Sequence, residues 1–107
     1  MILGVDIGGT NICFGLAENG KLVRLESVPS FFREATLEDT LTYLSEQIER
    51  FVPAGLERIG IGVPSVVDLK QGVVYDTVHI PSWREVPLKA YLEDRFHIPM
   101  AINNDAN

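Results

Sequence analysis

The sequence is short of three features that many functions require: paired cysteines, clustered positive charge and long apolar runs. Its only cysteine, Cys13, can form no internal disulfide and cannot build a thiolate metal site alone. The 9 Lys and Arg are outnumbered by 15 Asp and Glu, which gives a formal net charge of −6, and the basic residues form no cluster. A nucleic-acid site needs clustered positive charge, so we expect no nucleic-acid partner.

Signals for secretion and for membrane insertion are also missing from the sequence. Residues 1–6 lack the basic region and the apolar run of a signal peptide. No stretch approaches the ~20 apolar residues that cross a bilayer. We therefore expect a cytoplasmic protein that has no membrane partner.

The composition suits one folded domain. The chain has 107 residues and 46% of them are apolar, which is enough for a core but leaves little room for a second domain. Cys13 stands between Ile12 and Phe14 in a predicted strand, so we expect a small buried side chain there rather than a reactive thiol.

Apolar periodicity predicts strands that alternate with helices. Buried and alternating apolar runs predict strands at residues 2–7, 11–18, 21–28, 58–63 and 98–102. Apolar residues at helical spacing predict helices over residues 36–52 and from Pro87 to Phe96. This alternation is typical of an α/β sheet.

Turn and cap residues refine that order. Asn19-Gly20 predicts a hairpin, which gives the sheet an antiparallel opening. Thr36 is placed to cap the first helix. Residues 66–75 predict a pair of short extended segments that turn near Gln71-Gly72, and residues 76–86 are predicted as loop.

The first segment with chemical promise runs from Asp6 to Asn11. Gly8 and Gly9 let backbone N–H groups approach an anion, and Thr10 and Asn11 can add side-chain donors. The carboxylate of Asp6 suits a magnesium ion, directly or through water. An ordinary Gly-Gly turn between two strands is the competing interpretation.

Two further segments follow buried strands. Residues 62–68 leave a strand through a proline-containing turn. On its own, this pattern is weak evidence for a functional site. Residues 103–107, Asn-Asn-Asp-Ala-Asn, gather amides and a carboxylate at a strand end, where α/β folds bind ligands. Amides can bind hydroxyl groups, and the carboxylate of Asp105 can accept a hydroxyl proton. A helix N-cap is the competing interpretation of this segment.

Together these segments resemble the ROK (repressor, ORF, kinase) family in content, order and spacing across the whole chain. Asp-Ile-Gly-Gly-Thr-Asn at residues 6–11 is similar to the first phosphate motif of that family. Residues 62–68 resemble its Gly-x-Pro-Gly-x-Val-Asp segment, and residues 80–88 its Leu-Pro-x-Trp and Pro-Leu stretch. Asn-Asp-Ala-Asn at residues 104–107 matches a family signature.

The resemblance implies the N-terminal lobe of an actin-like ATPase (ribonuclease H-like) fold and ATP-dependent phosphorylation of a hexose or N-acetylhexosamine, with a glucokinase-like role as the leading hypothesis. It implies that the ATP phosphates face Gly8, Gly9, Thr10 and Asn11 and that Asp6 acts near Mg²⁺. Asn104 and Asp105 would bind the sugar, with Asp105 as catalytic base. Ser65, where the family usually has glycine, would also touch the sugar.

The family resemblance leaves alternatives open. Asn103 stands where many members have Glu. Family kinases have a second lobe with a zinc motif, which residues 1–107 do not contain, so we expect the isolated chain to be inactive. The resemblance is also compatible with a homo-oligomer of the complete protein. A sugar-sensing repressor is the main alternative, although no basic recognition helix precedes the motif at Asp6, and an ancillary actin-like domain is the other.

Overall fold

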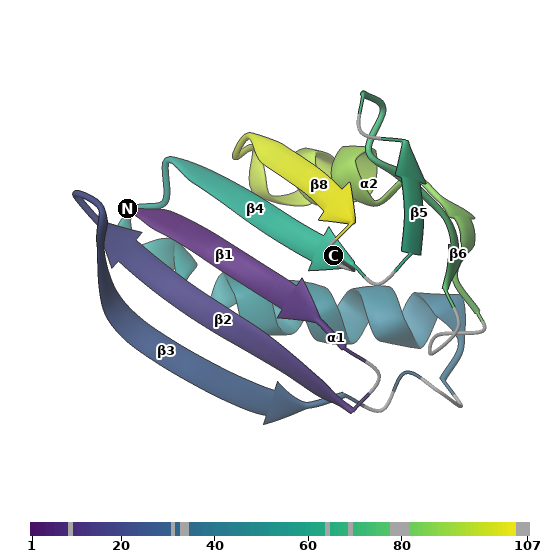
Figure 1. Cartoon of the computed structure of the whole chain (residues 1–107), viewed down its shortest axis with the longest axis horizontal. Helices are drawn as coiled ribbons and strands as arrows, with labels where there is room; N and C mark the ends of the chain where they lie inside the picture. Colours follow the sequence, from purple (N-terminus) through teal and green to yellow (C-terminus); the bar gives the residue numbers. More distant parts are fainter. Residues whose placement is uncertain are drawn as a thin grey trace.

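The fold is a five-stranded mixed sheet with two helices against one face and a smaller three-stranded sheet beside it (Figure 1). In this computed structural model, the described residues are 1–8, 10–30, 32, 35–63, 65–68, 70–77 and 82–104. The elements in chain order are β1 (Ile2–Ile7), β2 (Asn11–Glu18), β3 (Lys21–Pro29), α1 (Leu37–Glu49), η2 (Val52–Ala54), β4 (Arg58–Val63), β5 (Ser65–Asp68), β6 (Val73–Thr77), β7 (Arg84–Val86), α2 (Leu88–Phe96) and β8 (Met100–Asn104).

The large sheet has the strand order β3-β2-β1-β4-β8. β1, β2 and β3 form an antiparallel meander, whereas β4 and β8 run parallel to β1. The turn between β2 and β3 is the predicted one, because Asn19 and Gly20 have φ values of 52° and 80°. The smaller sheet is an antiparallel β5-β6-β7 arrangement.

The core lies between the large sheet and the two helices. Leu3, Val5 and Ile7 alternate inward along β1, and Leu44 and Ile48 of α1 pack in the same buried cluster. Leu88 and Leu92 bring α2 onto that cluster. Both helices therefore cover one face, and the other face is open among the described residues.

The predicted cap of α1 is confirmed, but the helix is shorter than predicted. The hydroxyl of Thr36 accepts the backbone N–H of Asp39 at 3.1 Å. The helix ends at Glu49 rather than at residue 52. Pro53 explains the early end, because it has no N–H to donate to the carbonyl of Glu49, and the chain continues into the short 3-10 helix η2.

Three further expectations from the sequence are wrong. Cys13 is exposed, because Ile12 and Phe14 fill the buried face of β2 and alternation turns Cys13 to the open face. Residues 76–86 are not all loop, since β6 continues to Thr77 and Arg84–Val86 forms β7. The last strand starts and ends two residues later than predicted, at Met100 and Asn104.

Candidate functional site

Three parallel strands end at one edge of the large sheet, and this edge gathers the segments that the sequence singled out. β1, β4 and β8 point their carboxyl ends the same way (Figure 1). The register pairs Asp6 with Gly62, and Gly62 with Asn103. Neighbouring strands lie about 4.8 Å apart, so the backbones of Asp6 and Asn103 are roughly 10 Å apart. Ligands of α/β folds bind at such an edge.

Asp6 presents its carboxylate on the open face at this edge. Val5 and Ile7 point into the core on either side, which leaves Asp6 exposed. Gly62 beside it has no side chain that could crowd it, and Cys13 is its neighbour on β2. Across the described residues, no three His, Cys, Asp or Glu side chains gather to hold a metal. A lone carboxylate fits Mg²⁺, which keeps waters and takes phosphate oxygens, better than a zinc cage.

The turn after β1 is closed by its own backbone. The N–H of Gly8 donates to the carbonyl of Asn11 at 2.9 Å. A Cβ at Gly8 would lie only 2.9 Å from the same oxygen, so this position needs glycine. Thr10 and Asn11 are exposed, and the Asn11 side-chain amide is placed 3.4 Å from the Thr10 hydroxyl. These polar groups are free to face an anion, while Gly9 lies outside the described residues.

A contact from β3 holds this turn in place. The backbone N–H of Ser30 donates to the carbonyl of Thr10 at 2.8 Å. Sequence reasoning did not identify Ser30. It directly follows β3, the strand that pairs with β2, so it fixes the turn from the side opposite β4.

The second segment starts the smaller sheet directly after β4. Ser65 is the first residue of β5 and pairs with Thr77 of β6. β4 runs to Val63, so β5 leaves the same edge at which Asp6 lies. The side chain of Ser65 is outside the described residues, and its predicted contact with sugar therefore stays a prediction.

The third segment is described only up to the end of β8. Asn103 is exposed on the open face, in the cross-strand row with Gly62 and Asp6. Asn104 pairs with Val63 through its backbone. The side chain of Asn104 and the whole of Asp105 lie outside the described residues, so their roles stay predictions.

A hollow of about 320 Å³ opens at the opposite end of the same strands. Its lining is mostly apolar: Ile2, Arg58, Ile59, Gly60, Pro99, Met100 and Ala101. Phosphates and sugar hydroxyls need donors and acceptors, which Asp6, Thr10 and Asn103 supply at the other edge. The distribution of donors and acceptors therefore favours the carboxyl edge of the strands, and not this hollow, as the candidate site.

Comparison with known proteins extends these observations. The sequence model of the ROK family matches residues 2–107. A glucokinase of Streptomyces coelicolor is 32% identical over 108 residues, which cover 100% of this chain and 33% of that protein. A putative xylose repressor of Caldicellulosiruptor sp. is 32% identical over 117 residues, covering 100% of this chain and 28% of the repressor. The chain thus spans about a third of the length of the curated relatives it matches.

Solved structures agree with the sequence relatives. A ROK family glucokinase from Streptomyces griseus, in complex with glucose and AMPPNP, matches with a TM-score of 0.83 and 31% identity. The match covers 99% of this chain and 33% of that one. The mixed sheet with flanking helices is therefore the predicted actin-like ATPase fold class. Since the family match spans almost the entire sequence, this chain belongs to the ROK family.

Proposed function

We propose that this chain is the N-terminal lobe of an ATP-dependent sugar kinase that phosphorylates a hexose or an N-acetylhexosamine. The observation that carries the proposal is the convergence of Asp6, the Gly8–Asn11 turn and the end of β8 at one sheet edge. The glucokinase relatives, one of them bound to glucose and AMPPNP, support the same activity. The protein works in the cytoplasm, where ATP and free sugars are available, without a nucleic-acid or membrane partner. Among the described residues, no helix is long and apolar enough to span a bilayer.

The Gly8–Asn11 turn binds the phosphate side of the nucleotide in this proposal. Gly8 and Gly9 let the backbone come close to the phosphates, and the polar ends of Thr10 and Asn11 face the phosphate oxygens, while the N–H of Gly8 keeps its bond to the carbonyl of Asn11. Asp6 would hold Mg²⁺, directly or through water. Such an ion would supply charge neutralisation for the phosphates, which is a large part of the catalysis of phosphoryl transfer.

The start of β5 and the end of β8 supply the sugar side. Ser65 and Asn104 bind sugar hydroxyls, and Asp105 accepts the proton of the attacking hydroxyl. The sugar oxygen then forms a bond to the γ-phosphorus while the bond to the bridging oxygen breaks and ADP leaves. Positioning of the two substrates in line supplies much of the rate.

A second lobe completes the enzyme in this proposal. Relatives are about three times as long as this chain, and a closed cleft is needed to exclude water from the reaction. The second lobe would carry the structural zinc and the remaining sugar contacts, and it would provide surfaces for homo-oligomers. We expect no sugar phosphorylation by residues 1–107 alone in a coupled assay.

The test of the proposal is Asp105→Asn in the protein that includes the second lobe. Loss of the base should lower kcat by about 10²- to 10⁴-fold, with an unchanged melting temperature. Asp94→Asn, which removes an exposed carboxylate of α2, is the matched control and should leave kcat unchanged. Full activity of Asp105→Asn would refute the assignment of the base.

A sugar-sensing repressor is the second candidate, because a putative xylose repressor matches the whole chain. Titration with a panel of hexoses separates the two functions when Mg·ATP is added afterwards. A kinase releases ADP with one of the sugars, whereas a sensor binds sugar without releasing ADP. Specific binding of duplex DNA that responds to sugar would favour the repressor.

A further inference from the structure

A buried hydrogen bond joins the smaller sheet to α1. Trp83 immediately precedes β7 and is fully buried. Its indole N–H donates to the hydroxyl of Thr40, with Nε1 and Oγ1 2.6 Å apart. The hydroxyl of Thr40, fully buried as well, donates onward to the carbonyl of Leu37 at 2.7 Å. Each of these polar groups therefore has a partner inside the core.

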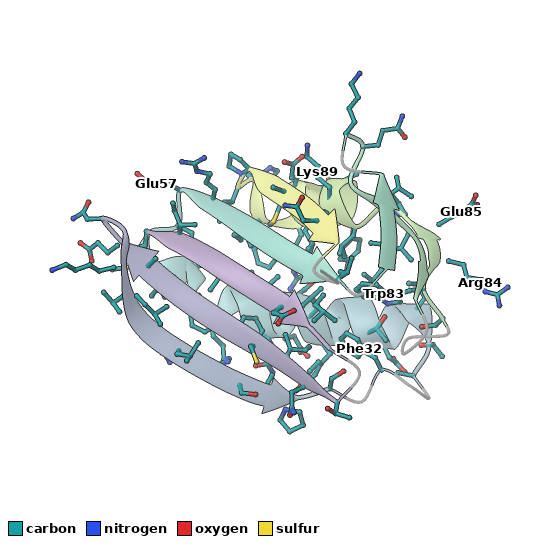
Figure 2. All side chains as sticks on the ribbon, in the orientation of Figure 1. Phe32, Glu57, Trp83, Arg84, Glu85 and Lys89 are labelled. Atoms are coloured by element: carbon teal, nitrogen blue, oxygen red, sulfur yellow. The ribbon has the colours of Figure 1, made fainter. Side chains whose placement is uncertain are left out.

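Phe32 extends this contact toward the Gly8–Asn11 turn (Figure 2). Its ring centroid lies 5.8 Å from that of Trp83, at an interplanar angle of 34°. The ring of Tyr43 packs edge-on against Phe32 with centroids 6.0 Å apart, and the Tyr43 hydroxyl donates to the carbonyl of Pro29 at 2.7 Å. Phe32 is thus clamped between α1 and Trp83 and is only 1% exposed.

These contacts link the two sides of the candidate site. On one side, Ser30 holds the carbonyl of Thr10, and Phe32 follows Ser30 closely along the chain. On the other side, β7 pairs with β6, and β6 pairs with β5, which begins at Ser65. Trp83 stands where the two sets of contacts meet. A shift of Trp83 would change the separation between the Gly8–Asn11 turn and β5.

Filling space does not explain this pair of residues. A purely apolar side chain could occupy the volume of Trp83 without burying an N–H that needs an acceptor. Threonine is also a modest helix former, yet Thr40 lies within α1. A satisfied buried polar contact specifies one orientation, which dispersion contacts alone do less well.

We propose that Trp83 is a positioning residue, whose hydrogen bond to Thr40 and contact with Phe32 set the distance between the phosphate side and the sugar side of the site. The proposal rests on the kinase function proposed above. Small errors in this distance are costly, since about 1 Å of misplacement can lower a rate by roughly 100-fold.

The variants Trp83→Phe and Thr40→Val test the proposal in the protein that includes the second lobe. Each removes one partner of the hydrogen bond; Thr40→Val nearly keeps the shape, whereas Trp83→Phe also removes part of the indole ring. We expect kcat/KM for the sugar to fall by about 10- to 100-fold in each. Thr40→Ser, which keeps the hydroxyl, should stay within about 3-fold of the parent, and the double variant should lose little more than either single one.

Phe51→Leu is the matched control for loss of stability. Phe51 is an equally buried aromatic residue that stacks on Phe14 at 5.3 Å beyond the other end of α1. It should lower the melting temperature without changing kcat/KM at temperatures where the protein is folded. If Trp83→Phe loses no more activity than Phe51→Leu, or if Thr40→Ser fails to restore activity, the proposal is wrong.

A measurement without catalysis keeps the two proposals separable. A nitroxide on the exposed Cys13, the only cysteine, broadens NMR amide signals of β6 and β7 according to distance. We expect this broadening to change in Thr40→Val of the 107-residue chain and to return to the parent pattern in Thr40→Ser. Unchanged broadening in Thr40→Val would overturn the positioning role. Absence of sugar phosphorylation in the protein that includes the second lobe, with altered broadening in Thr40→Val, would instead overturn only the kinase function.

Discussion

Gly72 closes the turn between β5 and β6 and lies directly against the first turn of α2. Its φ is +68°, a conformation that favours glycine. Its carbonyl accepts the backbone N–H of Lys89 at 3.2 Å. A Cβ at this position would lie 2.2 Å from the Cβ of Lys89. Gly72→Ala therefore combines an unfavourable backbone conformation with a steric overlap.

The two costs can be estimated separately. A left-handed conformation costs a residue with a Cβ about 1–2 kcal/mol. An extra carbon in a packed contact costs about 1–3 kcal/mol more. The backbone of Lys89 cannot retreat easily, because its neighbours Leu88 and Leu92 anchor α2 in the core. We expect Gly72→Ala to lower the free energy of unfolding by about 2–5 kcal/mol, a large part of the 5–15 kcal/mol typical of a domain.

Urea unfolding of the 107-residue chain measures this loss, and two other glycines isolate its steric part. Gly20 and Gly55 have φ values of +80° and +83°, but a Cβ at either would meet no atom within 4 Å. Gly20→Ala and Gly55→Ala should therefore show only the backbone cost of about 1–2 kcal/mol. If Gly72→Ala unfolds at the same urea concentration as these two variants, the contact between the turn and Lys89 is not the source of the cost.

Two further predictions concern acid stability and the end of α2. A hydrogen bond from the Arg50 guanidinium, with Nη1 and Oε1 3.0 Å apart, is the main cause that lowers the pKa of Glu26 below its usual value. The stability that the ionised Glu26 carboxylate contributes is therefore present above the unfolded pKa of about 4.3 and is lost as pH falls through the folded pKa. Glu26→Gln should flatten the pH dependence of the melting temperature in that range. An unchanged slope would contradict this prediction. His97 ends α2 with a φ of 56°, so His97→Gly should raise the free energy of unfolding by up to ~1 kcal/mol in urea, whereas Arg95→Gly inside the helix should lower it by about 1 kcal/mol.

Local sequence signals predicted most of the fold. Thr36 and Asn19-Gly20 act through neighbours in the chain, so their cap and turn could be identified without tertiary information. The first three strands and β4 follow from apolar periodicity for the same reason. Local signals could not predict that Asp6 and Asn103 meet at one edge, because this depends on the parallel pairing of β1, β4 and β8.

β7 was missed because it breaks strand alternation. Trp83 and Val86 both point into the core, although strict alternation would place them on opposite faces. Glu85 between them has a φ of 50° and is exposed with Arg84 (Figure 2). The left-handed conformation of Glu85 departs from the extended backbone that alternation requires, although the register of β7 against β6 stays regular. No period-two pattern was therefore present in the sequence to indicate this strand.

The contact between Ser30 and Thr10 that supports the Gly8–Asn11 turn could not be predicted from local sequence signals. Counting outward from the Asn19-Gly20 turn would pair Thr10 with Pro29, which has no N–H to donate. An irregularity between Leu16 and Ala17 shifts the register of β2 against β3. Ser30, which has the necessary donor, then reaches the carbonyl of Thr10. Because that irregularity has no clear local signal, the residue that anchors the proposed phosphate turn could be found only in the folded chain.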